Sequence, residues 1–558
     1  MAQRFQPFAL TGSSYAEIHG RFRWRLPGRF NIGVACTDAL PRNRLGLIDV
    51  SEAPARRYTF GELAELTNRV ANVLLGIGLE HGDRVAVVLP QIPATAMAHV
   101  GAFKARLVSV PLSSLFGTDA LRYRLADSGT KAVVTDAAGL ERIAALDGVP
   151  DLRWIFVTDR ASSSDPRVID FWRAAGEASP RFAEPTNDAD EPCMIIYTSG
   201  TTGPPKGVLH AHRVLFGQAS GFRVCHEFTP QPGDLMWTPA DWAWIGGLVN
   251  TLLLAWLHGV PMIAAPRRGF DPEWALNLLA EQGVRNVFLP TTALRMMLQC
   301  PIPPGIMLRS LVTGGEPQEV GLLEDARSKF GITFNESYGQ TEADFVIGQC
   351  ASRWPVRPGS MGLPYPGHDV QVQTPDGARC EAGEVGEVMV RAPDPTMLLE
   401  YWNRPEATRD KFQGSWLRTG DLARADDEGY FWFEARIDDV IKSAGYRIGP
   451  DEIEECLLRH EAVANTAVVG APDRLRGQIV MAYVQLRPGF EPSVKLESRL
   501  RAHVRQHLAA YQYPRVIEFA RSLPLTSSGK VDRGSLRAQA AGRSGDGPVK
   551  DDAGAPAP

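Results

Sequence analysis

Cysteine is scarce in this sequence, and its spacing is too wide for a CxxC metal or redox pair or a small disulfide framework. The 558 residues include seven cysteines, and the two nearest to each other are Cys350 and Cys380. A disulfide-stapled scaffold places its cysteines much closer together. We therefore expect reduced thiols and a cytoplasmic protein.

An excess of charge of one sign is also missing. Lys and Arg total 59 and Asp and Glu total 64, so the formal net charge is −5 at pH 7. Nucleic-acid binding relies on basic side chains that neutralise phosphates, and this balance argues against a nucleic-acid partner. It does not exclude a local basic pocket for a small anion.

Apolar runs suited to a signal peptide or a membrane helix are missing as well. The first 26 residues carry charges throughout, so we do not expect secretion. Residues 242–266 contain no Asp, Glu, Lys or Arg, but a His-Gly-Val-Pro step at 258–261 would end a membrane helix in mid-bilayer. We predict a buried helix followed by a buried strand, and no integral membrane segment.

The order of helix and strand signals predicts an α/β fold. Thr59 is a suitable N-cap for a helix with apolar residues at Leu63, Leu66 and Val70. Residues 84–90 form a short β-branched run typical of a strand that is buried on both faces. This alternation continues beyond residue 150 and favours parallel sheets covered by helices.

The later parts of the chain predict smaller domains. We expect a large N-terminal body, residues 1–437, with two α/β subdomains and a small β-rich subdomain at about 365–437. A mobile α+β C-terminal domain should follow at 438–540. The last 18 residues, 541–558, are mostly Gly, Ala, Pro and charged residues, and we expect a disordered tail.

The clearest functional motif is YTSGTTGPPKG at residues 197–207, which follows an apolar run. Its glycines, four hydroxyl side chains and Lys206 suit a loop that binds a polyphosphate through hydroxyl and backbone N–H groups. The loop is not a Walker A motif, because Lys206 is followed by Gly207 and not by Ser or Thr. The alternative interpretation is a glycine-rich surface turn.

Taken with five further segments in order, this motif resembles the AMP-forming acyl-CoA synthetases of the adenylate-forming superfamily. The segments are TGGEP at 313–317, ESYGQTE at 336–342, WLRTGD at 416–421, RIDDVIKSAGYR at 436–447 and LTSSGK at 525–530. The resemblance covers about residues 30–540. It implies a ligase that joins a carboxylic acid to CoA through an acyl-adenylate, with ATP, Mg²⁺ and CoA.

The resemblance implies catalytic roles for three residues. Lys530 would bridge the carboxylate and the α-phosphate, Thr341 would donate to the α-phosphate, and Glu342 would bind Mg²⁺. A solvated acid at a helix start is the alternative for Glu342. The implied ATP-binding residues are Thr198, Ser199, Gly200, Thr201, Thr202, Gly203, Lys206, Gly314, Gly315, Glu316, Pro317, Glu336, Ser337, Tyr338, Gly339, Gln340, Asp421 and Arg436.

The resemblance also implies that the C-terminal domain rotates about a hinge at Asp438 between two half-reactions. The residues implied at the CoA site are Ala444, Gly445, Tyr446, Arg447, Arg476 and Arg505. Only Arg447 lies in a strong motif, and Arg476 and Arg505 fit ordinary surface arginines equally well. Acetylation of Lys530 by a lysine acetyltransferase, reversed by a deacetylase, would remove its charge and control adenylation.

Three positions bear on the acid that is used. By resemblance, Trp244 lines the acyl pocket, and Gly339 replaces a tryptophan that closes this pocket in acetate-specific relatives. We therefore expect a short- to medium-chain acid. Core packing is the alternative for Trp242 and Trp244. Asp344 stands where many relatives have glycine: facing the pocket it would repel an acid substrate, and facing solvent it would have no effect.

Two other functions remain open from the sequence. An adenylating enzyme could pass the acyl group to a carrier protein or an amine, and a catalytically inert relative could serve as a nucleotide or acyl-CoA sensor. The charged motif positions are all present, which favours the active ligase. They are Lys206, Glu342, Asp421, Arg436 and Lys530.

Overall fold

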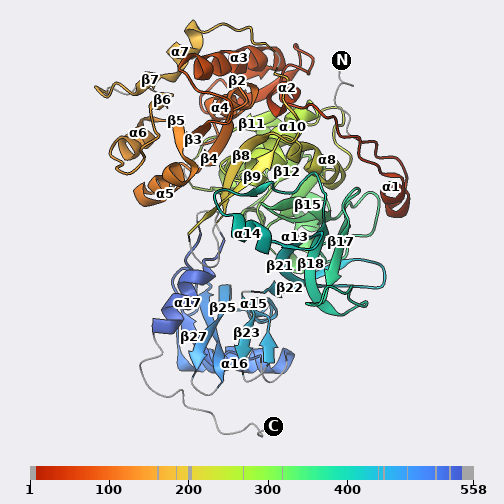
Figure 1. The fold of residues 1–558 in the computed structure, drawn as a ribbon. Coiled ribbons are helices and arrows are strands. Elements are labelled where there is room, and N and C mark those ends of the chain that lie inside the picture. Colours follow the sequence, from red (N-terminus) through yellow and green to blue (C-terminus); the bar gives the residue numbers. More distant parts are fainter. Residues whose placement is uncertain are drawn as a thin grey trace. The chain divides into compact units, whose positions relative to one another are not determined.

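The computed structural model shows a chain that forms two compact units (Figure 1). It describes residues 8–159, 163–183, 185–198, 204–267, 269–316, 318, 320–437, 439–443, 446–473, 476–508, 512–526 and 530–542. The larger unit comprises the described residues up to Gln371 with Met389–Thr419 and Asp426–Trp432. The smaller unit comprises Val372–Val388, Gly420–Ala425 and the described residues from Phe433 onward. Residues 541 and 542 of the predicted tail belong to a helix, so the tail boundary was set too early, and residues 543–558 lie outside the described residues.

Two mainly parallel sheets form the centre of the larger unit. In spatial order, the first contains β19 (Glu400–Tyr401), β9 (Lys206–Ala211), β8 (Pro192–Thr198), β4 (Val108–Leu112), β3 (Arg84–Val88), β5 (Thr130–Thr135), β6 (Trp154–Val157) and β7 (Val168–Asp170). The second contains β16 (Leu363–Pro364), β15 (Ala343–Gly348), β14 (Asn335–Gln340), β13 (Ser310–Gly314), β12 (Asn286–Phe288), β10 (Met236–Trp237), β11 (Met262–Ala264), β1 (Leu45–Asp49) and β2 (Arg56–Thr59). The predicted α/β class is confirmed.

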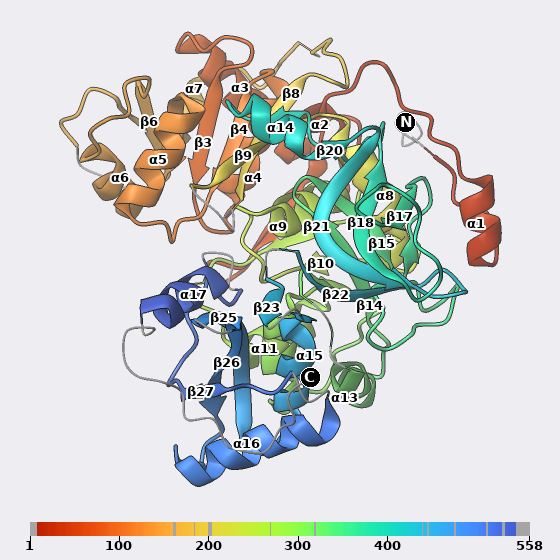
Figure 2. The ribbon, with the colours of Figure 1, turned by 60° about the horizontal axis from the view of Figure 1, so that its bottom comes forward.

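Helices cover both faces of the first sheet, because apolar side chains along its strands point alternately to one face and to the other. Val85 and Val87 pack with α3 (Phe60–Gly76) and α4 (Pro93–Lys104), whereas Ala86 and Val88 pack with α5 (Thr118–Ser128) and α6 (Ala137–Ala144). In Figure 2, α5 and α6 lie together along one side of these strands. A strand that is apolar on both faces needs this double cover, as the sequence predicts.

The remaining helices complete the layers of the larger unit. One core is shared by both sheets and includes α8 (Val214–Cys225) and α10 (Leu254–Leu257). On its other face, the second sheet packs against α11 (Pro272–Gln282), α12 (Thr291–Leu298) and α13 (Val320–Phe330). The shorter helices are α1 (Tyr15–Arg21), α2 (Ile32–Cys36), α7 (Phe171–Glu177), α9 (Ile245–Gly247) and α14 (Pro405–Asp410).

Two predicted elements can be checked residue by residue. Thr59 caps α3 through a reciprocal capping box with Glu62, which satisfies two backbone donors at the helix start. The uncharged segment 242–266 forms α9, a π-helix η1 (Leu248–Leu253) and α10, and then the buried strand β11. Both predictions are confirmed, although the π-helix was not expected. None of the described helices has the length and apolar character needed to cross a membrane.

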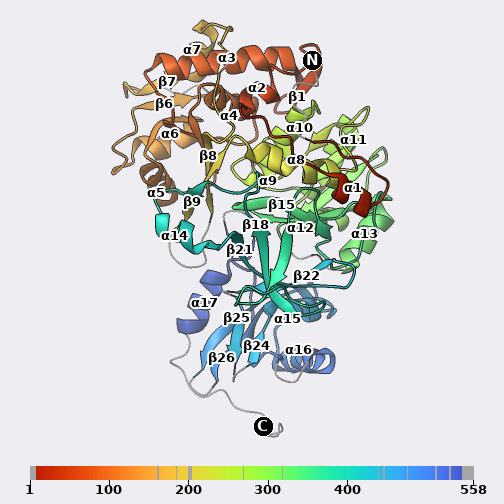
Figure 3. The same cartoon turned by 45° about the vertical axis from the view of Figure 1, so that its right-hand side comes forward.

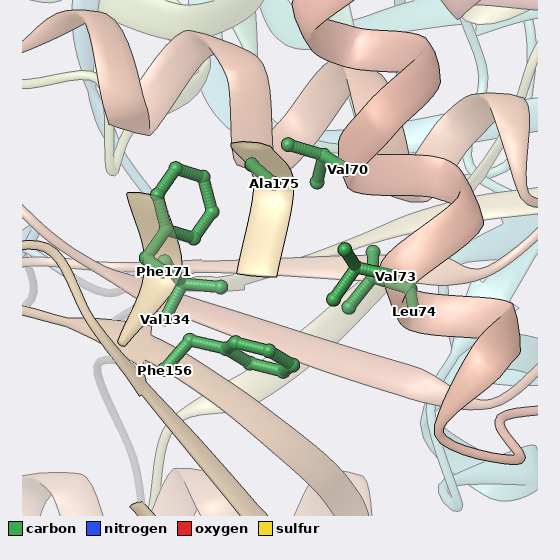
Figure 4. A pocket seen from close by; sticks show the side chains of 7 residues that line it. All are labelled: Val70, Val73, Leu74, Val134, Phe156, Phe171 and Ala175. Atoms are coloured by element: carbon green, nitrogen blue, oxygen red, sulfur yellow. The ribbon is translucent and has the colours of Figure 1, made fainter. Parts of the chain in front are cut away.

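A small apolar cavity of about 10 Å³ lies beside α3 and α7 (Figure 4). A buried water needs roughly that volume and two to four polar partners, and the side chains that line the cavity offer none. We therefore do not consider it a ligand site. The lining residues are Val70, Val73, Leu74, Val134, Phe156, Phe171 and Ala175.

The C-terminal part of the smaller unit is an α+β sandwich. Its sheet has the order β24 (Tyr446–Ile448), β23 (Ile441–Ser443), β26 (Gly477–Leu486) and β25 (Val463–Asp473), with β27 (Val516–Phe519) also paired to β26. One face packs against α15 (Pro450–Leu458) and α16 (Val494–His507), and the other against α17 (Arg533–Gly542). Figures 2 and 3 both show these helices on opposite sides of β25 and β26.

A further sheet contains the β-rich segment predicted at about 365–437. Its strands are β17 (Val370–Gln373), β18 (Val385–Arg391), β21 (Trp416–Ala425) and β20 (Phe412–Gln413), with β22 (Phe431–Arg436) paired to β21. These strands contribute residues to both units. The division of the chain into units therefore does not follow a single sequence position, and the boundary at residue 437 stays a prediction.

Candidate active site

The predicted phosphate loop connects two strands of a hairpin. In the antiparallel pair β8–β9, Tyr197 lies opposite Gly207 and Thr198 lies opposite Lys206, so the loop leaves and re-enters the sheet at one point. The Thr198 hydroxyl donates to the Lys206 carbonyl oxygen at 3.5 Å. Buried apolar residues of β8 pack into the cores on both faces of the first sheet and hold this hairpin in place. The loop positions Ser199, Gly200, Thr201, Thr202 and Gly203 lie outside the described residues.

Lys206 and Glu342, 136 positions apart in sequence, are connected through Tyr401. The Lys206 Nζ lies 5.1 Å from the centre of the Tyr401 ring, a distance typical of a cation–π contact. The Tyr401 hydroxyl donates to Glu342 Oε1 at 2.5 Å. Tyr401 reaches this position because β19 pairs with β9, which places Tyr401 opposite Val208. The structure thus brings together the predicted phosphate-binding lysine and the predicted metal-binding acid.

Glu342 lies with Thr341 in the tight turn between β14 and β15, and its side chain is 9% exposed. Its carbonyl oxygen accepts a hydrogen bond from the Leu398 N–H at 2.9 Å, which fixes the turn. The alternative of a solvated acid at a helix start is wrong, because Glu342 is buried and follows a strand. A buried carboxylate needs a partner, and a hydroxyl donor supplies part of that need.

His210 on β9 is a further neighbour of this turn. Burial lowers the pKa of its imidazole to about 4, and the Glu342 carboxylate and the Thr341 backbone only partly offset that effect. His210 is therefore neutral at pH 7. A neutral imidazole beside Glu342 adds a polar group to the site without adding a charge.

Two of the segments predicted to bind ATP, TGGEP and ESYGQTE, lie on neighbouring strands. β13 pairs in parallel with β14, so that Gly314 lies opposite Ser337 and Thr313 lies opposite Glu336. Gly315 follows with φ of +89°, a conformation that favours glycine and turns the chain away from the sheet. The Glu316 carbonyl oxygen accepts from Gln318 Nε2 at 2.7 Å. Pro317 lies outside the described residues.

Two residues of ESYGQTE have structural surroundings that bear on their roles. Glu336 is buried, and burial raises the pKa of its carboxyl well above its usual range. Ionisation of this carboxyl is therefore disfavoured in the folded protein. The Gln340 amide donates to the Thr419 carbonyl oxygen at 2.8 Å and accepts from Lys411 Nζ at 3.2 Å. Tyr338 is half-buried on β14 opposite Ile347.

Gly339 allows a close approach of β14 and β15. A Cβ at this position would lie 2.2 Å from Asp344 Oδ1 and 2.6 Å from the Phe345 nitrogen, so any side chain would displace this pair. Asp344 is 8% exposed, and its Oδ2 accepts from Asn250 Nδ2 at 2.8 Å. Asn250 belongs to the π-helix η1, and such irregular turns are frequent at functional sites. The space next to Gly339 is therefore occupied by a carboxylate.

The two tryptophans near the predicted acyl pocket differ in burial. Trp242 is fully buried in the core shared by both sheets, so core packing is its role. Trp244 is half-buried at the start of α9, with its ring 5.9 Å from the Phe116 ring in an edge-to-face contact. Directly before Trp242, Asp241 accepts from the Ser113 hydroxyl at 2.8 Å, and burial raises the pKa of Asp241. Trp244 stays the candidate for the acyl pocket.

Asp421 and Arg436, the other predicted nucleotide contacts, form an ion pair in the smaller unit. Arg436 Nη1 lies 3.0 Å from Asp421 Oδ1. Their strands β21 and β22 are paired, which explains how residues fifteen positions apart meet. Asp421 is 3% exposed, whereas 39% of the Arg436 side chain is exposed. The guanidinium thus lies directly beside the buried carboxylate, as in a charge-assisted hydrogen bond.

Lys530 is exposed on a turn of the smaller unit. An isolated bridge joins Leu525 and Val531, and the Lys530 N–H donates to the Thr526 hydroxyl at 3.2 Å. The turn fixes the Lys530 backbone and leaves its side chain accessible. Ser527, Ser528 and Gly529 lie outside the described residues.

The residues predicted at the CoA site and the hinge are only partly described. Asp438, Ala444 and Gly445 lie outside the described residues. Tyr446 and Arg447 begin β24, where their backbones pair with Ser443 and Lys442. Arg476 directly precedes β26, and its N–H donates to Asp473 Oδ1 at 2.8 Å. Arg505 near the end of α16 lies 3.9 Å above the Tyr513 ring, a contact that also suits an ordinary surface arginine.

Sequence reasoning missed three residues that the structure places beside the predicted ones: Tyr401, His210 and Asn250. Tyr401 and Asn250 meet their carboxylate partners only through sheet pairing and helix packing, across 59 and 94 positions of sequence. No local pattern marks such partners. His210 could have been noticed, because a histidine that follows the apolar pair Val208-Leu209 in a strand is worth examining.

Comparison with known proteins gives matches along most of the chain. A family model described as "AMP-binding enzyme" matches residues 39–402, and one described as "AMP-binding enzyme C-terminal domain" matches residues 452–530. Acetyl-coenzyme A synthetase of Bacillus subtilis (strain 168) is 34% identical over 548 residues, covering 94% of this chain and 95% of that protein. The mitochondrial acyl-coenzyme A synthetase ACSM4 of Rattus norvegicus is 34% identical over 507 residues, covering 87% and 85%.

Solved structures show the same architecture. The anthranilate CoA ligase AuaEII, in complex with anthranoyl-AMP, superposes with a TM-score of 0.83 at 27% sequence identity. The match covers 92% of this chain and 98% of that one. The larger and the smaller unit therefore both have counterparts in a structure that contains an acyl-adenylate.

Proposed function

This chain belongs to the AMP-binding enzyme family and is an AMP-forming acyl-CoA synthetase, and from this premise we propose that it activates a short- to medium-chain carboxylic acid. In the first step a carboxylate oxygen attacks the α-phosphorus of ATP, the bond to the β-phosphate breaks, and pyrophosphate leaves. In the second step the CoA thiol sulfur attacks the acyl carbonyl, its proton passes to solvent, and AMP leaves. The enzyme itself supplies no nucleophile.

The observation that carries this proposal is the connection from Lys206 through Tyr401 to Glu342. Lys206, at the end of the loop, suits the phosphate groups of a metal–polyphosphate ligand. Glu342, in the turn between β14 and β15, suits the metal ion of that ligand. Mg²⁺ prefers one or two carboxylates together with phosphate oxygens, and Glu342 fits that preference. When bound, the ion would neutralise phosphate charge. Tyr401 would hold the carboxylate in place, and Thr341 would donate to the α-phosphate.

We assign the remaining roles as follows. Asp421 would accept from the ribose hydroxyls while Arg436 holds its side chain in place, a role supported by their 3.0 Å ion pair. The exposed Lys530 would neutralise the carboxylate and α-phosphate oxygens during attack, which is electrostatic stabilisation of the transition state. Arg447, Arg476 and Arg505 are the candidates for the CoA phosphates, because a guanidinium pairs well with phosphate.

A panel of acids from acetate to decanoate tests the proposal through release of pyrophosphate and formation of acyl-CoA. We expect acid-dependent pyrophosphate release with an optimum among the short and medium chains. Lys530→Ala should abolish acyl-adenylate formation and largely spare thioester formation from supplied acyl-adenylate. Lys495→Ala provides the matched control, because Lys495 is an exposed lysine on α16 of the same unit.

The same assays distinguish the ligase from the two other functions that the sequence leaves open. Absence of pyrophosphate release with every acid would contradict the ligase and favour a sensor. Pyrophosphate and AMP formation that does not respond to CoA would indicate another acyl acceptor. In either case the proposed role of CoA would be wrong.

We also propose control and location for this enzyme. The exposed position of Lys530 suits a lysine acetyltransferase, and acetylation would remove the charge that adenylation needs. Mass spectrometry of active and inactive fractions should find acetyl-Lys530 only in the inactive one, and an unmodified Lys530 in both would contradict this. The seven cysteines are all unpaired, five of them buried, which supports a reducing compartment such as the cytoplasm.

A further inference from the structure

A group of metal-ligating side chains lies in the smaller unit, on α15 and α16. Cys456 belongs to α15, and His503 and His507 lie one turn apart on α16. One potential ligand atom from each of the three lies within 4.8 Å of the other two. Cys456 is buried, His503 is half-buried and His507 is exposed. None of these residues has a role in the proposed reaction, so the group requires its own explanation.

The hydrogen bonds of the two histidines leave one nitrogen of each ring for a metal. His503 Nε2 lies 3.0 Å from the Cys456 carbonyl oxygen, and His507 Nδ1 lies 2.8 Å from the His503 carbonyl oxygen. A carbonyl accepts only, so these nitrogens carry the protons, and Nδ1 of His503 and Nε2 of His507 keep their lone pairs. Histidines that bind metal almost always donate their other N–H to such an oxygen.

The distances are close to those that a tetrahedral ion requires. Zinc–sulfur bonds of about 2.3 Å and zinc–nitrogen bonds of about 2.0–2.1 Å place neighbouring ligand atoms roughly 3.3–3.6 Å apart. The group, at up to 4.8 Å, therefore needs side-chain shifts on the order of 1 Å. His507 is the last residue of α16 and is exposed, so its side chain can make that adjustment without disturbing the core.

A fourth ligand is available nearby. The ring of His460, which follows α15, lies 5.3 Å from the ring of His503. Its Nδ1 accepts from the Ala462 N–H at 3.2 Å, so the proton is on Nε2, and binding a metal through Nε2 would move this proton to Nδ1 and break the hydrogen bond from Ala462. His460 is 9% exposed, and it would complete a Cys-His₃ set after a rotation of its ring, with water as the other choice.

We propose that Cys456, His503 and His507 bind a Zn²⁺ ion that joins α15 to α16. A thiolate with two imidazoles favours zinc among biological cations, whereas Mg²⁺ and Ca²⁺ prefer oxygen ligands. Binding converts the Cys456 thiol to a thiolate and releases its proton to solvent, with no change of oxidation state. The ion would stabilise the smaller unit, because it binds the folded arrangement of two helices and not the unfolded chain.

Metal titration of the full-length, tag-free protein tests this site. After chelation and removal of the chelator under reducing conditions, Co²⁺ should bind with a stoichiometry of one. It should give a thiolate-to-cobalt charge-transfer band and tetrahedral visible bands, and Zn²⁺ should displace it. Zn²⁺ should also raise the midpoint of thermal unfolding of the smaller unit.

The variants are chosen so that folding and metal binding can be separated. His507→Gln changes an exposed side chain and should weaken Zn²⁺ affinity at least tenfold, while the unfolding midpoint of the metal-free protein stays unchanged. Cys456→Ser should remove the charge-transfer band. Cys380→Ser and His81→Gln, which change a thiol and an imidazole elsewhere, should bind like the wild type.

Two results would overturn the proposal. One is a Co²⁺ complex without a thiolate band in the wild type. The other is an equal affinity for Zn²⁺ in the wild type and in His507→Gln. Neither measurement depends on ligase activity, so failure of this site would leave the proposed function untouched.

Discussion

The buried Glu336 carboxyl should make the stability of the larger unit depend on pH. Burial raises its pKa well above the usual range in the folded protein, whereas in the unfolded chain the group has an ordinary pKa. Above that ordinary value the unfolded state loses the proton and the folded state keeps it. Stability contributed by the neutral acid is therefore fully present at low pH and is lost as the pH rises toward the folded-state pKa. Glu336→Gln, which cannot ionise, removes this dependence.

The size of the effect follows from proton linkage. One proton more in the folded than in the unfolded state lowers the free energy of unfolding by about 1.4 kcal/mol per pH unit. Between pH 6 and pH 8 the advantage of Glu336→Gln over the wild type should therefore grow, by at most about 3 kcal/mol. The exchange of a carboxyl for an amide adds a constant that does not change with pH.

Urea denaturation of both proteins at half-unit steps between pH 5 and pH 8, followed by tryptophan fluorescence, measures this difference. Glu141→Gln is the matched control, because Glu141 is an exposed glutamate on α6 of the same unit, and its difference from the wild type should stay flat. A flat difference for Glu336→Gln as well would refute the reasoning, since it would mean that the folded protein ionises Glu336 as readily as the unfolded chain.

Three further changes test the geometry around the candidate site. Gly339→Ala should destabilise the larger unit by about 1–3 kcal/mol in thermal unfolding, because its Cβ would overlap Asp344 Oδ1 and the Phe345 backbone nitrogen. An unchanged stability would show that β14 and β15 can move apart. Tyr401→Phe should lose about 1.5–3 kcal/mol in the same assay, because the donor to a buried carboxylate is removed, and a smaller loss would mean that Glu342 is satisfied elsewhere. Asp421→Asn should raise the KM for ATP at least tenfold with little change in the KM for the acid, and equal changes in both would argue against a ribose contact.

The elements of this fold could be predicted where local patterns are strong. The structure contains the predicted cap at Thr59 and the predicted strand at residues 84–88, which is apolar on both faces. Both features depend on residues that are close together in the sequence. The uncharged segment 242–266 was predicted correctly as helix and strand, but its π-helical turn was not. A π-turn depends on packing partners such as Asp344, which lies 94 positions from Asn250.

The same limit applies to the candidate site. Motifs identified Lys206 and Glu342, because their chemistry depends on short segments. The tyrosine between them could not be predicted, since it reaches them through a two-residue edge strand that pairs with β9. Contacts of this kind are set by sheet order, and the sequence around Tyr401 contains no signal for its partner.

Asp344 shows how the structure narrows the acid preference that the sequence left open. Of the two orientations considered, solvent exposure is excluded, because the side chain is 8% exposed and accepts a hydrogen bond from Asn250. It also occupies the space next to Gly339, the position that by resemblance sets the depth of the acyl pocket. A glycine there adds depth only as far as the neighbouring carboxylate allows. A methylene group of the substrate gains roughly 0.8 kcal/mol when it is buried in an apolar pocket. A methylene group that packs against this carboxylate gains less. Chain-length preference in this enzyme should therefore depend on residue 344 as much as on residue 339.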